Sequence, residues 1–140
     1  AHPGIFQKGL MMSETDMMVR LETMQSALAG KPHLKRLGAL FCDTVLFEVD
    51  GHDYYLHFHR GALERIEQGP SRKIPWQFAF RTDAKALDEF WKALPAPGFH
   101  DIFGLVKIGR ARIEGDMLRL LRNLRFFKEF MALARQGADT

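Results

Sequence analysis

The sequence predicts one α+β domain in which helices cover one face of a five-stranded, mainly antiparallel sheet. Three observations predict this class: an apolar stripe at helical spacing before residue 30, alternating apolar segments between 45 and 80, and a strand, a glycine and a capped helix after residue 109. The order of helix, four strands, helices, strand and helix is typical of α+β folds. We expect a loose arm at 1–12, the domain at 13–136 and a short tail at 137–140.

The first predicted helix follows residues 13–16, which are suited to capping a helix N-terminus. Its apolar stripe is spaced by four, three and four residues and consists of Met17, Leu21, Met24 and Leu28. Gly30 marks its C-terminal end, and Lys31 and Pro32 stop the helix.

Four strands are predicted next, because apolar and polar residues alternate with a period of two. The first two strands, 45–49 and 54–58, flank a turn at 50–53 that contains aspartate and glycine. A second turn at 60–61 leads to a short strand at 63–67 and a loop at 68–71. The fourth strand has an aromatic face, formed by Trp76, Phe78 and Phe80.

The C-terminal half is predicted to contain three helices and one strand. Asp83 opens a helix that extends to Leu94, and a short helix occupies 99–107. Residues 110–114 alternate as a half-buried strand, Gly115 breaks it, and Asp116 caps one amphipathic helix over 117–136.

Charge and cysteine content point to a reducing, cytoplasmic setting. Cys42 is the only cysteine, so an intramolecular disulfide is excluded, and we expect its side chain to be buried. No apolar run reaches the length of a transmembrane helix, and residues 1–8 lack a signal-peptide pattern. The net charge is +3, but residues 107–135 carry +5 and the rest of the chain carries −2. This asymmetry suggests a basic surface at the C-terminal end.

Catalytic, metal and nucleic-acid functions find little support in the sequence. No serine lies in a G-x-S-x-G turn, and the glycine spacing at 104–109 lacks the lysine and hydroxyl residue of a phosphate-binding loop. His57 and His59 share a strand face, but no further ligand completes a metal set, so we favour a solvated polar face. The strand aromatics alternate with polar residues, which favours burial over base stacking. We therefore expect no enzyme activity, cofactor, metal or nucleic-acid partner.

Residues 109–116, Gly-Arg-Ala-Arg-Ile-Glu-Gly-Asp, together with the helix that begins near Asp101 and with Met117, Leu120 and Leu121, resemble the C-terminal end of the sterol carrier protein 2 (SCP2) sterol-binding domain family. The pattern of elements is similar over about residues 15–135. The resemblance implies a five-stranded sheet and helices that enclose an apolar tunnel. It implies binding, and possible transfer, of a hydrophobic lipid such as a sterol, fatty acyl chain, phospholipid or isoprenoid quinone.

The resemblance places six side chains near the tunnel: Phe103, Val106, Met117, Leu120, Leu121 and Leu124. Strand and helix residues expected to face the same space complete the predicted ligand-binding set: Phe47, Leu56, Phe58, Trp76, Phe78, Phe80, Ile102 and Ile113. The content of twelve Phe and seven Met suits a core that adapts to a flexible guest, although an ordinary aromatic core has the same composition.

The last predicted helix carries large apolar residues among its arginines: Leu118, Phe126 and Leu133 beside Arg119, Arg122 and Arg125. Contact with an anionic membrane explains this mixture, and so does a homodimer or another partner. Packing beneath the N-terminal arm is a third explanation. The alternative function is therefore a non-catalytic interaction domain with a filled core that docks through this helix.

Overall fold

The computed structural model describes residues 14–136, so the arm at 1–12 and the tail at 137–140 lie outside the described residues. An open five-stranded sheet has the order β3-β2-β1-β4-β5. Only the β1–β4 pair is parallel, which confirms the mainly antiparallel prediction. The strands are β1 (Thr44–Val49), β2 (His52–His59), β3 (Ala62–Gln68), β4 (Phe78–Thr82) and β5 (Arg112–Gly115).

Two tight hairpins set the register of β1, β2 and β3, as predicted. Asp50 and Gly51 both have positive φ, at 53° and 85°, and Arg60 and Gly61 repeat this at 50° and 80°. Two consecutive residues with positive φ form the turn whose twist matches that of antiparallel strands. Phe47 consequently pairs with Tyr54 across β1 and β2.

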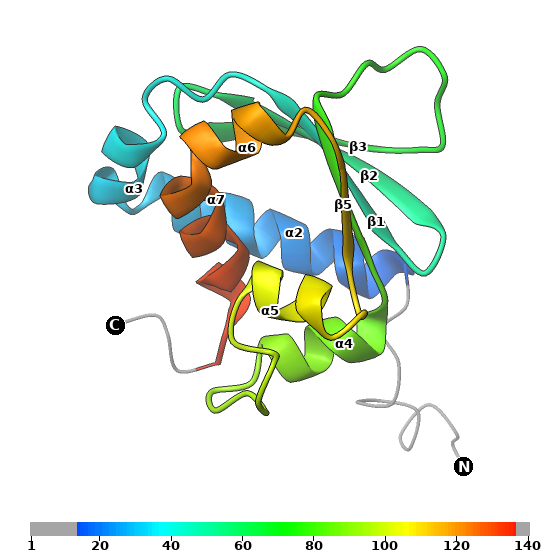
Figure 1. The fold of residues 1–140 in the computed structure, drawn as a ribbon. Helices are drawn as coiled ribbons and strands as arrows, with labels where there is room; N and C mark the ends of the chain where they lie inside the picture. Colours follow the sequence, from blue (N-terminus) through cyan, green and yellow to red (C-terminus); the bar gives the residue numbers. More distant parts are fainter. Residues whose placement is uncertain (1–13, 137–140) are drawn as a thin grey trace.

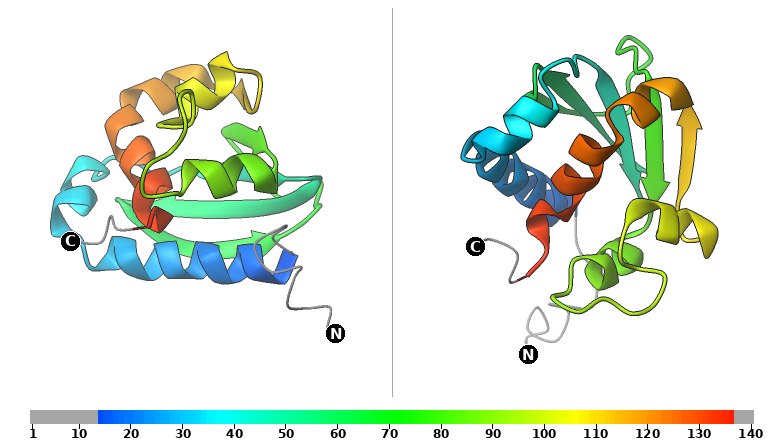
Figure 2. Two further views of the ribbon diagram at one scale, coloured as in Figure 1. Left: turned by 90° about the horizontal axis from the view of Figure 1, so that it is seen from below. Right: turned by 60° about the vertical axis from the view of Figure 1, so that its left-hand side comes forward.

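All the helices contribute to one core on the same face of the sheet (Figures 1 and 2). Asp83, Asp101 and Asp116 cap three of them by accepting backbone N–H groups, as their positions in the sequence predict for Asp83 and Asp116. The helices are α2 (Glu14–Ala29), α3 (Pro32–Leu37), α4 (Ala84–Phe90), α5 (Ile102–Lys107), α6 (Met117–Arg122), α7 (Leu124–Met131) and the 3-10 turn η1 (Ala132–Ala134).

The capping contact of Asp83 makes part of the stability depend on pH. Burial raises the pKa of this carboxyl group, but the N–H of Ala86 and the guanidinium of Arg110 lower it by more, so the net pKa lies below 3.8. The two donors lie 2.8 and 3.0 Å from Asp83 Oδ1. A lowered pKa in the folded state stabilises the protein above the unfolded-state pKa, and this stabilisation is lost as the pH falls through the folded value.

We therefore expect the free energy of unfolding to fall once the pH drops below 3.8. Asp83→Asn should show a smaller fall, because its side chain no longer takes up a proton. Urea unfolding at about pH 6 and about pH 3 measures both. Glu64→Gln, at an exposed position of β3, is the control and should behave like the parent protein. An equal loss in Asp83→Asn and the parent would contradict the role of this cap.

The first helix ends at Ala29, as predicted, but one helix was missed and one boundary differs. Pro32 begins the additional helix α3, because proline fits the first turn of a helix, where its missing N–H costs nothing. The helix predicted to reach Leu94 ends at Phe90, and Leu94 is 89% exposed. Trp91 caps α4 and stays buried, where its indole N–H donates to the carbonyl of Met131 at 2.7 Å.

The single helix predicted over 117–136 is also wrong, because it breaks at Asn123. This residue has φ −121° and ψ 27°, and its side-chain amide donates to the carbonyl of Arg119 at 3.2 Å. Asparagine competes for backbone hydrogen bonds in this way and is a poor residue for a helix interior. The break gives α6 and α7 separate orientations (Figure 1), so their apolar faces do not form one continuous stripe.

Phenylalanine side chains fill the space between α7 and the sheet. The Phe58 ring centroid lies 5.0 Å from that of Phe130, 5.1 Å from Phe41 and 5.7 Å from Phe126. Phe127 packs edge-on against Phe78 at 5.3 Å. Edge-to-face contacts at these distances are favourable beyond simple burial. This part of the core is therefore packed by the protein's own side chains.

Candidate functional site

The predicted ligand-binding residues separate into groups of different exposure. One group is buried on the inner face of the sheet and in the helices that cover it, and all its members belong to the main core: Phe47, Leu56, Phe58, Phe78, Phe80, Ile102 and Leu120. The structure therefore brings them together, and they form the apolar floor beneath the helices.

A second group borders this core beside the edge strand β5. Four of its members are half-buried and pack against the core: Phe103, Val106, Ile113 and Leu124. Met117 and Leu121 of α6 are 38% and 53% exposed. We call these six residues the rim. They come from α5, β5, α6 and the start of α7, and Figure 1 shows α5 and α6 at opposite ends of β5. The rim is the candidate site, because four of its apolar side chains pack against the core and the other two are exposed on α6.

Gly115 and Asp116 fix the point where the rim passes from β5 into α6. Gly115 has φ 100°, and a Cβ atom there would lie 2.6 Å from the carbonyl oxygen of Gln77. Only glycine combines this conformation with such a close approach. The N–H of Asp116 donates to the same carbonyl at 2.8 Å, and its side chain accepts from the N–H of Arg119. The start of α6 is thereby held against β4.

An ion pair between Arg119 and Asp43 holds α6 a second time. Arg119 Nη1 bonds to Asp43 Oδ1. The Asp43 side chain is 3% exposed, whereas that of Arg119 is 49% exposed. Asp43 is the one charged residue that is buried in the part of the chain the structure describes. Its role is not visible in the sequence, because a lone aspartate before a strand is typical of a turn.

Trp76 lies on the opposite face of the sheet from the other predicted ligand-binding residues. It packs, half-buried, against a small cluster of Leu46, Tyr55 and Ala79. The predicted alternation with Phe78 and Phe80 fails because β4 begins only at Phe78, and residue 76 precedes the regular strand.

The residues predicted to contact a membrane or a partner also divide. The exposed members are Leu118, Arg119, Arg122 and Arg125. Phe126 is 1% exposed, and Leu133 is half-buried against the core. The break at Asn123 explains the difference, because it turns α7 so that Phe126 points inward. A Cβ atom on Gly38 would lie 2.6 Å from the Phe126 ring, so α3 closes over this side chain.

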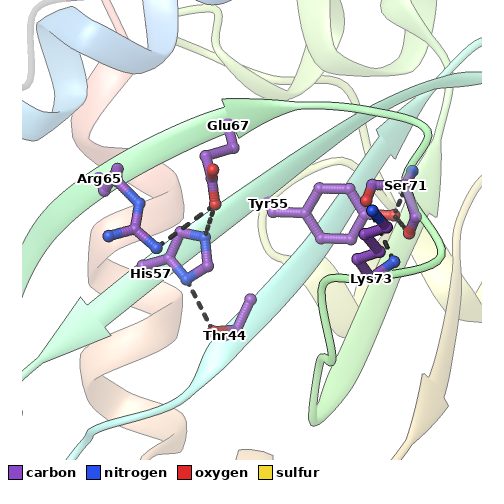
Figure 3. A network of polar contacts seen from close by, with 7 residues as sticks. All are labelled: Thr44, Tyr55, His57, Arg65, Glu67, Ser71 and Lys73. Atoms are coloured by element: carbon purple, nitrogen blue, oxygen red, sulfur yellow. Dashed lines mark hydrogen bonds and ion pairs between the residues drawn. The ribbon is translucent and has the colours of Figure 1, made fainter.

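The outer face of the sheet carries a polar network as well as the small apolar cluster (Figure 3). Thr44 Oγ1 lies 2.9 Å from His57 Nδ1, and His57 Nε2 lies 2.6 Å from Glu67 Oε1. Both ring nitrogens therefore have partners, and His57 is half-buried rather than fully solvated. Two open grooves of about 390 and 220 Å³ flank this face, and Arg81 lines both. Arg81 is held by Glu48 and Glu114, at 3.1 and 2.7 Å.

The structure also bears on the predictions for the cysteine, for metal binding and for membrane spans. Cys42, predicted to be buried, is exposed, while its neighbour Phe41 is in the core. Residues 14–136 contain no group of three or more His, Cys, Asp or Glu side chains placed to hold a metal ion. None of the helices described in this range is long and apolar enough to cross a membrane.

An open five-stranded sheet with helices on one face defines a class of α+β fold that solved structures share. The chain has an SCP2-like fold. Sterol carrier protein 2 matches with a TM-score of 0.66 and 13% identity, over 86% of this chain and 96% of that chain. A conserved hypothetical protein from Thermus thermophilus matches with a TM-score of 0.63 and 12% identity, over 89% of this chain and 87% of that chain.

A UbiJ-SCP2 ubiquinone synthesis protein matches with a TM-score of 0.55 and 16% identity, over 81% of this chain and 90% of that chain. No family model and no curated protein sequence matches the chain. These identities establish the fold alone. The resemblance read from residues 109–116 is therefore confirmed at the level of the fold.

Proposed function

We propose that this protein binds a hydrophobic lipid between the rim and the apolar floor of the core. The observation that carries the proposal is the rim itself: half-buried and exposed apolar side chains that lead into a core packed with apolar residues. The SCP2-like fold supports it, because the neighbours include a sterol carrier protein and a ubiquinone synthesis protein. The ligand class comprises sterols, fatty acyl chains, phospholipids and isoprenoid quinones. We propose no catalytic step and place the protein in the cytoplasm.

The mechanism is partition of apolar surface out of water. Each methylene group that leaves water contributes about 0.8 kcal/mol, so a ten-carbon chain gains roughly 8 kcal/mol before ordering costs. The rings around Phe58 are already in contact, because their centroids lie 5.0–5.7 Å apart. We therefore propose that the acyl chain of the lipid lies on the β5 side of the core. Binding in that position needs α5 or α6 to move outward, and release needs the same motion.

The test measures binding of a fluorescent fatty acid to delipidated protein in the absence of membranes. Val106→Gln and Ile113→Gln change rim residues outside α6 and should weaken binding about tenfold, which corresponds to about 1.4 kcal/mol. Leu94→Gln is the control, because Leu94 is 89% exposed and lies outside the rim. Thermal melts establish that each variant is folded. Equal affinity of rim and control variants, or no binding by the parent protein, would contradict the proposal.

A second candidate function is an interaction domain with a filled core that docks through the C-terminal helices, either to a partner or to a second copy. The packed phenylalanines around Phe58 favour it, because they leave no space for a guest in that part of the core. Native mass spectrometry separates the two functions. Purified protein that carries a stoichiometric lipid supports lipid binding, whereas lipid-free protein that binds no added fatty acid supports the interaction domain.

A further inference from the structure

Helix α6 exposes three large apolar side chains to solvent on one side. Met117, Leu118 and Leu121 are 38%, 55% and 53% exposed. At about 100° per residue, they fall within an arc of about 100° on the helix surface. The remaining apolar residue of this helix, Leu120, is fully buried and holds α6 on the core. A six-residue helix that turns most of its apolar residues outward has a face that the described chain does not cover.

Arginine side chains border this apolar face. Around the helix, Arg122 follows Leu118 directly and Arg119 comes next. Arg125, the second residue of α7, is paired with Glu129 at 3.1 Å, while Arg119 is paired with Asp43 and Asp116. Arg122 has no ion-pair partner among residues 14–136, and it is exposed. An apolar strip bordered by an unpaired arginine is complementary to a partner with an apolar interior beneath an anionic surface layer.

We propose that α6 docks on an anionic lipid bilayer, with Met117, Leu118 and Leu121 inserted among the headgroups and Arg122 at the phosphates. Long cationic side chains keep their charge at this level while their stems cover apolar surface. The proposal rests on the proposed lipid function. Met117 and Leu121 belong to the rim, so docking would place the rim against the membrane and let a lipid pass without crossing water.

A bilayer suits this face better than a second copy of the chain. Stable protein interfaces bury about 800 Å² on each partner. Three partly exposed side chains on one short helix supply only a small part of that area. The positive charge of the segment also opposes self-association, because residues 107–135 carry +5. Anionic headgroups offset the same charge.

The test places an environment-sensitive nitrobenzoxadiazole dye on α6. In a Cys42→Ser background, Leu118→Cys carries the dye on the proposed face, and Leu94→Cys carries it on the exposed loop after α4 as a control. With vesicles of phosphatidylcholine and phosphatidylglycerol, the dye at position 118 should shift its emission to the blue and brighten severalfold, while position 94 should not change. Vesicles of phosphatidylcholine alone should give a weaker response.

A second measurement uses the unlabelled protein and vesicle sedimentation. Leu118→Gln with Leu121→Gln should weaken vesicle binding at least tenfold, whereas Leu40→Gln with Leu94→Gln should leave it within twofold, because these two residues are 91% and 89% exposed elsewhere. Arg122→Gln should reduce the preference for anionic vesicles. Equal responses at positions 118 and 94 overturn the docking surface. So does a shift at position 118 that follows protein concentration without vesicles, which indicates a second copy.

The two proposals fail separately. In one outcome, the protein takes up fatty acid in solution, but vesicle binding is the same with and without the apolar residues of α6. This result contradicts the docking surface and is consistent with the lipid function. Protein that docks through α6 but takes up no fatty acid supports the docking surface and contradicts the lipid function.

Discussion

Replacement of Phe58 by alanine is expected to lower the free energy of unfolding by about 3–5 kcal/mol. The reason is its position among other rings: the side chain is buried and contacts Phe41, Phe126 and Phe130 with centroids 5.0–5.7 Å apart. Truncation removes apolar contacts and leaves a cavity, because β2 and α7 cannot move together enough to fill the space. Because small domains have only about 5–15 kcal/mol of stability in total, much of the reserve would be lost.

Urea unfolding followed by circular dichroism measures this effect. Leu94→Ala is the control and should change the stability by less than about 0.5 kcal/mol, since Leu94 is 89% exposed. A loss below about 1 kcal/mol for Phe58→Ala would mean that the rings around it are not packed as described. It would also reopen this part of the core as a place for a lipid.

Removal of the Arg119 side chain is expected to destabilise the protein by about 1–3 kcal/mol, because Asp43 then stays buried without its guanidinium partner. The value is at the lower end for a buried pair, since the Arg119 side chain is 49% exposed and water screens it. Arg125→Ala is the matched control. It breaks a surface pair with Glu129, in which the arginine side chain is 76% exposed, and should cost less than about 1 kcal/mol.

A double-mutant cycle isolates the pair. Asp43→Asn combined with Arg119→Ala should cost clearly less than the sum of the two single variants, because the second change removes no further interaction. Additive losses, or equal effects of Arg119→Ala and Arg125→Ala, would contradict the assignment of Arg119 as the anchor of α6.

The parts of the fold that sequence predicted correctly depend on local chemistry. Strands β1 and β2 follow from alternation over a few residues, and Asp50 and Gly51 supply the backbone conformation that joins them. The caps at Asp83 and Asp116 follow from one short acceptor placed before an apolar period. These signals involve residues only a few positions apart, so they do not depend on tertiary contacts.

The predictions that failed depend on contacts distant in sequence. Asn123 weakens a helix locally, but asparagine is tolerated in many helices, and the packing of Phe126 beside Gly38 at the end of α3 favours the break as well. Asp43 becomes important only because α6, some 76 positions later, brings Arg119 to it. The exposure of the rim residues was not predicted either: all six are apolar, but four pack against the core and two are exposed on α6.

The short edge strand also governs how the molecule opens. β5 pairs with β4 through four residue pairs and has no partner on its other side in the described part of the chain. Segments held on one side by few hydrogen bonds are the first to separate in local unfolding, at a cost well below that of global unfolding. Brief detachment of β5, with β1 to β4 still folded, would let α5 and α6, which flank β5 in the chain, move outward as the proposed lipid binding requires. Under the proposed function, the β5 edge is therefore where we expect the lipid to enter.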